Sequence, residues 1–215
     1  MTSVPTAVAP VAGGDLLFVV EADMIDALRV EDGSTAWQLP FADPLAVPLV
    51  WDNGWLIAVT IDGSVRAFRA SDGYVVWRRD IGSPAHAPPT LDADRVYVPT
   101  EDGRVVSLRV DTGAVVWDHR LGGAPSNILA VGDRLYVGSK DNFFYCLDTE
   151  DGNAKWAVRT GADVIGRPVI DEHRVYFVSL DNILRALNRH TGNQQWKRAL
   201  TIRPTAGPVQ AGEAV

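Results

Sequence analysis

A tryptophan recurs along this chain at a nearly constant spacing, and this repeat constrains the fold more than any other feature. Successive copies are separated by 40, 40, 39 and 40 residues, at Trp37, Trp77, Trp117, Trp156 and Trp196. A glycine stands four positions before each one, at Gly33, Gly73, Gly113, Gly152 and Gly192. A small residue stands ten positions before each one, at Ala27, Ala67, Ser107, Cys146 and Ala186. Three columns kept in register across five copies indicate tandem structural units.

Each repeat has the pattern of short β-strands. Runs of β-branched and aromatic residues, such as Trp55–Val59 and 174–178, follow a shorter apolar segment and precede a strand that ends at the small residue. The tryptophan lies on the next strand, after the turn that holds the glycine. Four strands in about 40 residues, repeated in tandem, are typical of a propeller blade.

The turn inside each repeat reads Asp-Gly or Asp-Asn in four copies, at Asp62-Gly63, Asp102-Gly103, Asp141-Asn142 and Asp181-Asn182. These pairs predict two-residue type I′ hairpins, in which both central residues have positive φ. The first copy has Ala22-Asp23 there, which is a weaker turn former.

We therefore expect an all-β protein with one β-propeller domain over residues 1–215, built from four-stranded antiparallel blades. The predicted blades span residues 7–40, 47–80, 87–120, 126–159 and 166–199, and the start of a sixth spans 205–215. Since seven or eight blades need about 280–320 residues at this period, we expect a fragment of a seven- or eight-bladed ring. The alternative is a shorter chain that completes its ring by oligomerising. An open arc would expose two apolar blade faces, which predicts self-association.

The tryptophan column is expected to fill the space between successive blades, beside the small residues. One blade is too small to bury both of its faces, so each must stack on a neighbour. The sequence leaves open which blade supplies each contact. Cys146 belongs to the small column and is expected to be a core residue.

Composition excludes several classes of function. The formal net charge of −7 and a pI near 5.0 argue against a nucleic-acid partner. No run approaches about 18 consecutive apolar residues, so no membrane span is expected. Residues 1–11 show neither a signal-peptide pattern nor a cysteine that could carry a lipid, and the sequence does not settle the compartment.

The repeats resemble a known family. The pattern Ala-Leu-Asp-x-x-Thr-Gly-x-x-x-Trp is the tryptophan-docking motif of pyrroloquinoline-quinone (PQQ)-like repeats. Residues 146–156 and 186–196 fit it best, whereas the first three copies carry Arg29, Arg69 and Arg109 where the family often has Asp. WD40 repeats have a similar length, but only Trp117-Asp118 gives their Trp-Asp pair and no Gly-His pair opens the repeats.

The resemblance implies three alternative functions. Relatives of the outer-membrane assembly lipoprotein BamB are non-catalytic scaffolds that bind protein through blade-top loops, and this implies a periplasmic or cell-envelope location. Quinoprotein oxidoreductases hold PQQ and Ca²⁺, but the vicinal cysteine pair often found in them is absent and none of their metal-ligand segments can be recognised in this chain. A sensor or ligand-binding domain of a larger protein is the third alternative. We favour the first, with a protein partner and no cofactor.

No catalytic, cofactor or metal constellation is evident in the sequence. The four histidines occupy unrelated repeat positions, and neither a Gly-x-Ser-x-Gly elbow nor a Walker-type loop is present. The candidate binding face therefore rests on loops. It comprises the turn aspartates Asp62, Asp102, Asp141 and Asp181, which are expected to share one face with the loops between blades and either attract a cation or basic segment or simply shape their turns. The loops between blades add irregular residues, among which we select His86 and Arg167: Asp43, His86, Asn127, Asp163, Arg167 and Arg203. Trp51, next to the Asp52-Asn53-Gly54 turn and outside the tryptophan column, is the one aromatic residue expected to be an exposed contact.

Overall fold

Five four-stranded antiparallel sheets follow one another along the chain, which confirms the predicted propeller-blade architecture. The computed structural model describes residues 9–209. All regular secondary structure in that range is β-strand. Strand order follows the sequence in each sheet. The elements of blades 1 to 5 are, in turn, β1 (Val11–Gly13), β2 (Leu16–Glu21), β3 (Met24–Arg29), β4 (Thr35–Pro40); β5 (Val50–Asp52), β6 (Trp55–Val59), β7 (Ser64–Arg69), β8 (Val75–Asp80); β9 (Thr90–Asp92), β10 (Arg95–Pro99), β11 (Arg104–Arg109), β12 (Val115–Arg120); β13 (Pro125–Val131), β14 (Arg134–Ser139), β15 (Phe143–Asp148), β16 (Ala154–Arg159); β17 (Val164–Ile170), β18 (Arg174–Ser179), β19 (Ile183–Asn188), β20 (Gln194–Ala199).

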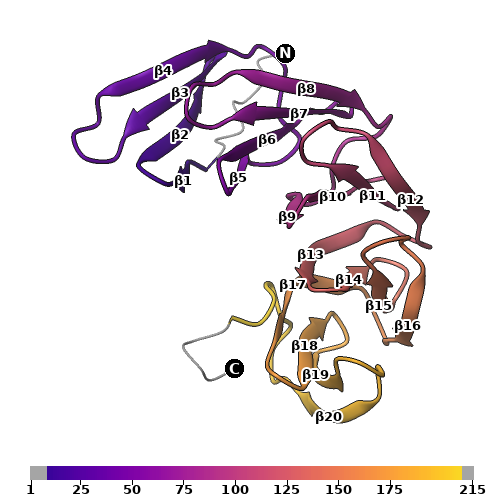
Figure 1. Cartoon of the computed structure of the whole chain (residues 1–215). Helices are drawn as coiled ribbons and strands as arrows, with labels where there is room; N and C mark the ends of the chain where they lie inside the picture. The colour runs from indigo at the N-terminus through magenta and orange to yellow at the C-terminus, as the bar shows by residue number, and fades with distance from the viewer. Residues whose placement is uncertain (1–8, 210–215) are drawn as a thin grey trace, which may run out of the picture.

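The described blades form an open arc (Figure 1). The first strand of each blade (β1, β5, β9, β13, β17) lines the concave side, and the tryptophan-bearing fourth strand lies on the convex side. Of the predicted sixth blade, residues 205–209 form no strand, and 210–215 lie outside the described residues.

The concave-side strands differ in length from blade to blade. In blades 2 and 3 they begin only at Val50 and Thr90, later than the blade starts predicted at residues 47 and 87. Pro48 lies two residues before Val50 and Pro89 directly before Thr90, and proline has no N–H to donate to a ladder. In blades 4 and 5 the strands begin at Pro125 and Val164, a little earlier than predicted.

The prediction of two-residue type I′ turns at the aspartate column is wrong. Gly63 has φ +85° and Asn142 has φ +66°, but the aspartate before each is not among the positive-φ residues. The Gly63 N–H donates to the Thr60 carbonyl, and the Thr60 N–H donates to the Ser64 carbonyl. This pattern is that of a three-residue hairpin loop whose last residue is left-handed. Both central residues of the turn between β5 and β6, Asn53 and Gly54, do have positive φ.

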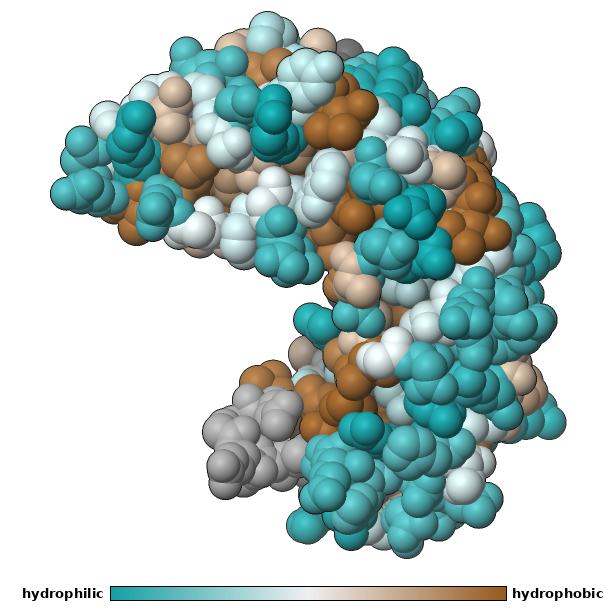
Figure 2. All heavy atoms as spheres, in the orientation of Figure 1, coloured by the Kyte–Doolittle hydropathy of each residue, from teal (hydrophilic) through white to brown (hydrophobic). Residues whose placement is uncertain are grey.

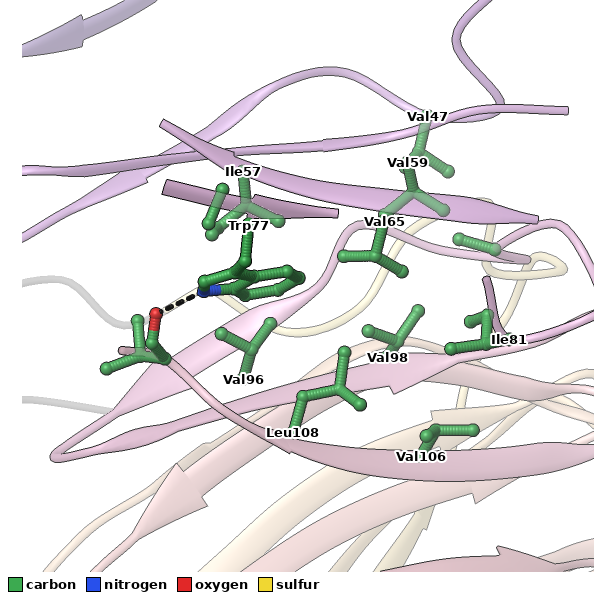
Figure 3. Packing of buried hydrophobic residues seen from close by; sticks show 13 residues of the cluster. Val47, Ile57, Val59, Val65, Trp77, Ile81, Val96, Val98, Val106 and Leu108 are labelled. Carbon is green, nitrogen blue, oxygen red and sulfur yellow. Dashed lines mark hydrogen bonds between the residues drawn. The ribbon is translucent and has the colours of Figure 1, made fainter. Parts of the chain in front are cut away.

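The core lies between the blades. Within residues 9–209 the buried apolar residues form four clusters, one at each interface between successive blades. Figure 3 shows the interface of blades 2 and 3, where Trp77 lies among Ile57, Val96 and Leu108. The Trp77 Nε1–H donates to the Val110 carbonyl at 2.7 Å.

Each docked indole lies on the column glycine of the following blade. A Cβ added to Gly113 would lie 2.5 Å from Trp77 Cε3, and φ at Gly113 is +66°. The same relation joins Gly73 to Trp37, Gly152 to Trp117 and Gly192 to Trp156. The small column has a different position, since Ala67 pairs with Trp77 across the same sheet. The glycine is thus required twice, for its backbone conformation and for the space its missing side chain leaves.

At three of the four interfaces a backbone carbonyl of the following blade accepts a hydrogen bond from the docked indole. Trp37 and Trp117 donate to the carbonyls of Ala70 and Thr149, at 3.0 and 2.9 Å. At the interface of blades 4 and 5 the equivalent carbonyl, that of Arg189, instead accepts a hydrogen bond from the Tyr136 hydroxyl at 3.0 Å. The buried Trp156 Nε1–H is consequently left without a partner among the described residues.

At the two ends of the arc, within the described residues, this contact between a docked tryptophan and a column glycine is not made. Trp196 is 40% exposed, compared with 8% for Trp77. Gly33 has φ +71° like its counterparts, but nothing lies within 4 Å of a Cβ placed there. The repeat unit is therefore the contact between two blades and not the single blade.

Candidate functional site

The loops between blades and the turns of the aspartate column lie at one end of the blades, which we call the loop end. In each of blades 2 to 5 a backbone N–H of the turn donates to a carbonyl of the loop that enters the same blade: Ile61 to Pro44, Glu101 to Pro84, Lys140 to Ala124 and Leu180 to Asp163. The turns between the first and second strands, such as Asn53-Gly54, lie at the opposite end because the strands alternate in direction. The sequence prediction that the turns and loops share one face is consistent with this pairing.

Two irregularities shape the loop end of blades 4 and 5. The pairing of β13 with β14 shifts between Pro125 and Ile128, and the pairing of β17 with β18 shifts between Ile165 and Val169. Gly166 lies within the second irregularity with φ +69°. Irregularities of this kind turn side chains out of the regular alternation of a strand.

A pocket of about 220 Å³ lies at these irregularities and is lined by residues of blades 3, 4 and 5. We call it the loop-end pocket. Its polar side chains come from three different interblade loops or strand starts and one turn: His86, Ser126, Asn127, Asp163 and Lys140. The buried Val164 and Ala87 contribute to its wall. It therefore exists only because three blades are held in fixed relation by their docked tryptophans.

Most polar side chains of this pocket have no partner among the described residues. His86, Asn127, Lys140 and Asp163 make no side-chain hydrogen bond or ion pair with other residues in the range 9–209. His86 is half-buried and Lys140 is exposed. Burial and the nearby Lys140 ammonium lower the pKa of His86, which the Glu101 carboxylate partly offsets. The imidazole is thus neutral at neutral pH, and it can donate one hydrogen bond and accept another.

The aspartate column behaves differently, because its carboxylates are engaged by the chain's own donors. Asp62 accepts from the Thr60 hydroxyl and the Ser64 N–H. Asp141 accepts from Tyr145 Oη at 2.7 Å and from the Gly122 N–H at 2.9 Å. These contacts give the aspartates a role in the turns and in holding neighbouring loops.

The other two turn aspartates are paired with arginines. Asp102 accepts from Arg104 Nε at 2.7 Å and from the Thr100 hydroxyl at 2.6 Å. Burial raises the pKa of Asp181, but hydrogen bonds from Arg185, Ser179 and the Gly161 N–H outweigh it and hold that pKa at about 2. Both carboxylates are therefore ionised at neutral pH but already have cationic partners.

The structure brings only part of the predicted binding face together. His86 lines the loop-end pocket, and the exposed Arg167 follows Gly166, which also lines it. Trp51 is the middle residue of β5, close to the Asn53-Gly54 turn at the end of the blade opposite the loop end. Its side chain is half-buried against the backbone of Gly13 in blade 1. Sequence reasoning singled out Asn127 and Asp163 only as irregular loop residues and missed Lys140. The one available signal was the position of Lys140 directly before the Asp141-Asn142 turn.

Among residues 9–209 no group of three or more His, Cys, Asp or Glu side chains is arranged to hold a metal ion. No helix within that range is long and apolar enough to cross a membrane.

The family is decided by comparison with known sequences. The family model described as "Outer membrane protein assembly factor BamB" matches residues 21–129 and again residues 121–215. The chain belongs to this family. Individual BamB proteins align over a shorter region: the one from Yersinia pestis is 29% identical over 89 residues, which is 39% of this chain and 23% of that protein. The BamB of Moranella endobia (strain PCIT) is 27% identical over 89 residues, with the same coverage. The aligned regions thus span about a quarter of these curated BamB relatives.

Solved structures show the same fold. The crystal structure of BamB from Moraxella catarrhalis superposes with a TM-score of 0.81 at 22% identity, covering 94% of this chain and 66% of that one. The computationally designed Ika8 protein also gives 0.81, at 13% identity, covering 95% and 65%. A europium-containing methanol dehydrogenase gives 0.74 at 14% identity, covering 88% and 50%. At these identities the likeness concerns the fold alone.

Proposed function

We propose that this BamB-family chain is a non-catalytic scaffold of the cell envelope that binds a protein involved in outer-membrane protein assembly, using its loop end. The class of partner follows from the description of the family as an outer membrane protein assembly factor. A location on the periplasmic side of the outer membrane is part of the same proposal. We propose no cofactor.

The observation that carries the proposal is the convergence of free polar side chains at the loop end. The turn carboxylates already have partners within the chain, as Asp181 has in Arg185, Asp102 in Arg104 and Asp141 in Tyr145. The loop-end pocket instead gathers His86, Asn127 and Lys140 without partners among the described residues. Polar groups on loops held by a rigid scaffold are typical of binding surfaces.

Similarity to a methanol dehydrogenase does not extend the proposal to catalysis. That likeness rests on 14% identity and carries no functional residue across. We expect no dye-linked oxidation of alcohols when PQQ and Ca²⁺ are added to the protein. A turnover that requires both additions would overturn the non-catalytic part of the proposal.

The binding part is tested by photo-cross-linking in cells that produce the protein. A benzophenone amino acid is placed at Arg167 on the loop end, and at Ser71, an exposed residue of the turn between β7 and β8 at the opposite end. We expect a discrete adduct with an outer-membrane or periplasmic protein from position 167 and none from position 71. Adducts from position 71 alone, or equally from both, would overturn the assignment of the binding face.

A further inference from the structure

The loop-end pocket combines a free cation and a free carboxylate within one small cavity. Lys140 enters from the turn between β14 and β15, and Asp163 from the loop that precedes β17. Neither side chain has an ion-pair partner among residues 9–209. An unpaired ammonium and an unpaired carboxylate in one cavity suit a ligand that has an acceptor on one side and a donor on the other.

The other polar side chains of the pocket add hydrogen-bond donors to the Lys140 ammonium. The imidazole of His86 lies close enough to the Lys140 ammonium for that charge to lower the pKa of His86. The Asn127 side chain reaches the same pocket because the irregular pairing of β13 takes it out of the regular ladder. The Ser126 hydroxyl is already used, since its one hydrogen is shared between the carbonyls of Gly138 and Gly166, whose oxygens lie 3.2 and 3.4 Å from Oγ. Lys140, His86 and Asn127 are therefore the groups left to meet a ligand.

The size of the pocket and the charges around it restrict the class of ligand that it can bind. A volume of about 220 Å³ is below the roughly 300–1,000 Å³ of pockets for drug-sized molecules, so the cavity suits one side chain of a partner. The Asp163 carboxylate disfavours a dianion such as phosphate by like-charge repulsion. The chain as a whole carries −7, so an acidic group is not drawn by the overall field and must be recognised locally.

We propose that the loop-end pocket binds the carboxylate of an aspartate or glutamate side chain in an extended segment of the partner protein. Lys140 supplies the opposing charge, while His86 and Asn127 donate hydrogen bonds to the carboxylate oxygens. Asp163 accepts a backbone N–H of the same segment. This inference rests on the proposed function for its protein partner, and it deepens it by naming the chemical group that the loop end recognises.

The test uses the whole 215-residue chain and a short peptide. Acetyl-Gly-Glu-Gly-amide is titrated into the isotope-labelled protein while the ring signals of the four histidines are followed by NMR. We expect saturable shifts of the His86 ring with a dissociation constant on the order of 1 mM, because a ligand this small makes few contacts. The pKa of His86 should rise when the peptide is bound, since the carboxylate favours the imidazolium.

Matched controls separate recognition from non-specific attraction. The Gln peptide should bind at least about tenfold more weakly, because it lacks the charge that Lys140 pairs with. Acetyl-Gly-Gly with a free C-terminal carboxylate distinguishes a chain end from a side chain, and it should bind more weakly than the Glu peptide. Lys140→Gln should weaken Glu-peptide binding about tenfold. Lys197→Gln, on the exposed outer strand β20, should leave binding unchanged.

Two results would overturn the inference: no saturable shift of His86 with the Glu peptide, or equal loss of binding in the Lys140 and Lys197 variants. Tighter binding of the free C-terminal peptide would also overturn it as stated. These failures are distinguishable from failure of the proposed function. The cross-link from position 167 reports partner binding at the loop end whether or not a carboxylate enters the pocket.

Discussion

Replacing Gly113 by alanine tests the joint between blades 2 and 3 with a single methyl group. Gly113 lies in the turn between β11 and β12 with φ +66°, and its missing side chain makes room for the indole of Trp77. An added Cβ would lie 2.5 Å from one ring carbon and 2.6 Å from another. The indole is held by its hydrogen bond to Val110 and by the packed cluster around it, so it cannot withdraw freely.

The magnitude follows from two separate effects. Alanine in the left-handed region costs about 1–2 kcal/mol wherever it occurs. Overpacking against the indole adds about 1–3 kcal/mol, and this applies only where the ring is present. Gly33 and Gly82 have φ of +71° and +74° with nothing within 4 Å of a Cβ, so they measure the first effect alone. Gly33 has the same position in its repeat as Gly113 has in its own, and Gly82 is a control far from either terminus of the sequence.

Urea denaturation followed by tryptophan fluorescence gives the free energy of unfolding for each variant. Gly113→Ala should be less stable than Gly33→Ala and Gly82→Ala by about 1–3 kcal/mol. The midpoint of thermal unfolding should fall by about 2–4 °C for each kcal/mol in a chain of this length. If Gly113→Ala costs no more than both controls, the indole does not lie on Gly113 and the account of the joint is wrong.

Three further predictions concern the stability of the chain. Trp77→Ala should lower the free energy of unfolding by about 3–5 kcal/mol, whereas Trp196→Ala should lower it clearly less because Trp196 is 40% exposed. Calorimetry measures both losses, and equal losses would contradict the docking account. Trp156→Phe should be milder than Trp77→Phe by about 1 kcal/mol, since the Trp77 N–H is bonded and the Trp156 N–H is not; the reverse order in urea titrations would count against it. Asp181 has a folded pKa of about 2, below its unfolded value of about 3.9, so its contribution to stability is complete above about pH 4 and is lost as the pH falls toward 2. Asp181→Asn should therefore flatten the dependence of Tm on pH between 4 and 2, which an unchanged slope would disprove.

The repeat in the sequence was sufficient to predict the blades because their main contacts repeat with it. A tryptophan, a glycine and a small residue kept in register already imply stacked units. The turn type was not accessible in this way, since Asp62-Gly63 is compatible both with a two-residue turn and with a three-residue loop. Only the backbone pairing of Thr60 with Ser64 decides between them.

The candidate site was less predictable than the fold for a physical reason. The loop-end pocket depends on where the pairing of β13 and β17 becomes irregular, and this is set by contacts between blades. Gly138 is an example, because a Cβ there would lie 2.4 Å from Val164 of the following blade. Lys140 has no distinguishing sequence neighbour other than the turn it precedes, so its proximity to His86, more than 50 residues away, appears only in the fold. Figure 2 likewise shows hydrophilic residues over most of the convex rim, a feature that marks no site.

The most direct measurement of the central claim is a hydrogen-exchange footprint of the chain with its cross-linked partner protein. If the loop end is the binding face, the partner should slow amide exchange in segments 84–87, 124–127 and 163–167. Exchange in the turns at 52–54 and 70–73, at the opposite end of the blades, should stay unchanged. Protection confined to those turns, or to the outer strands β8, β12 and β16, would contradict the account.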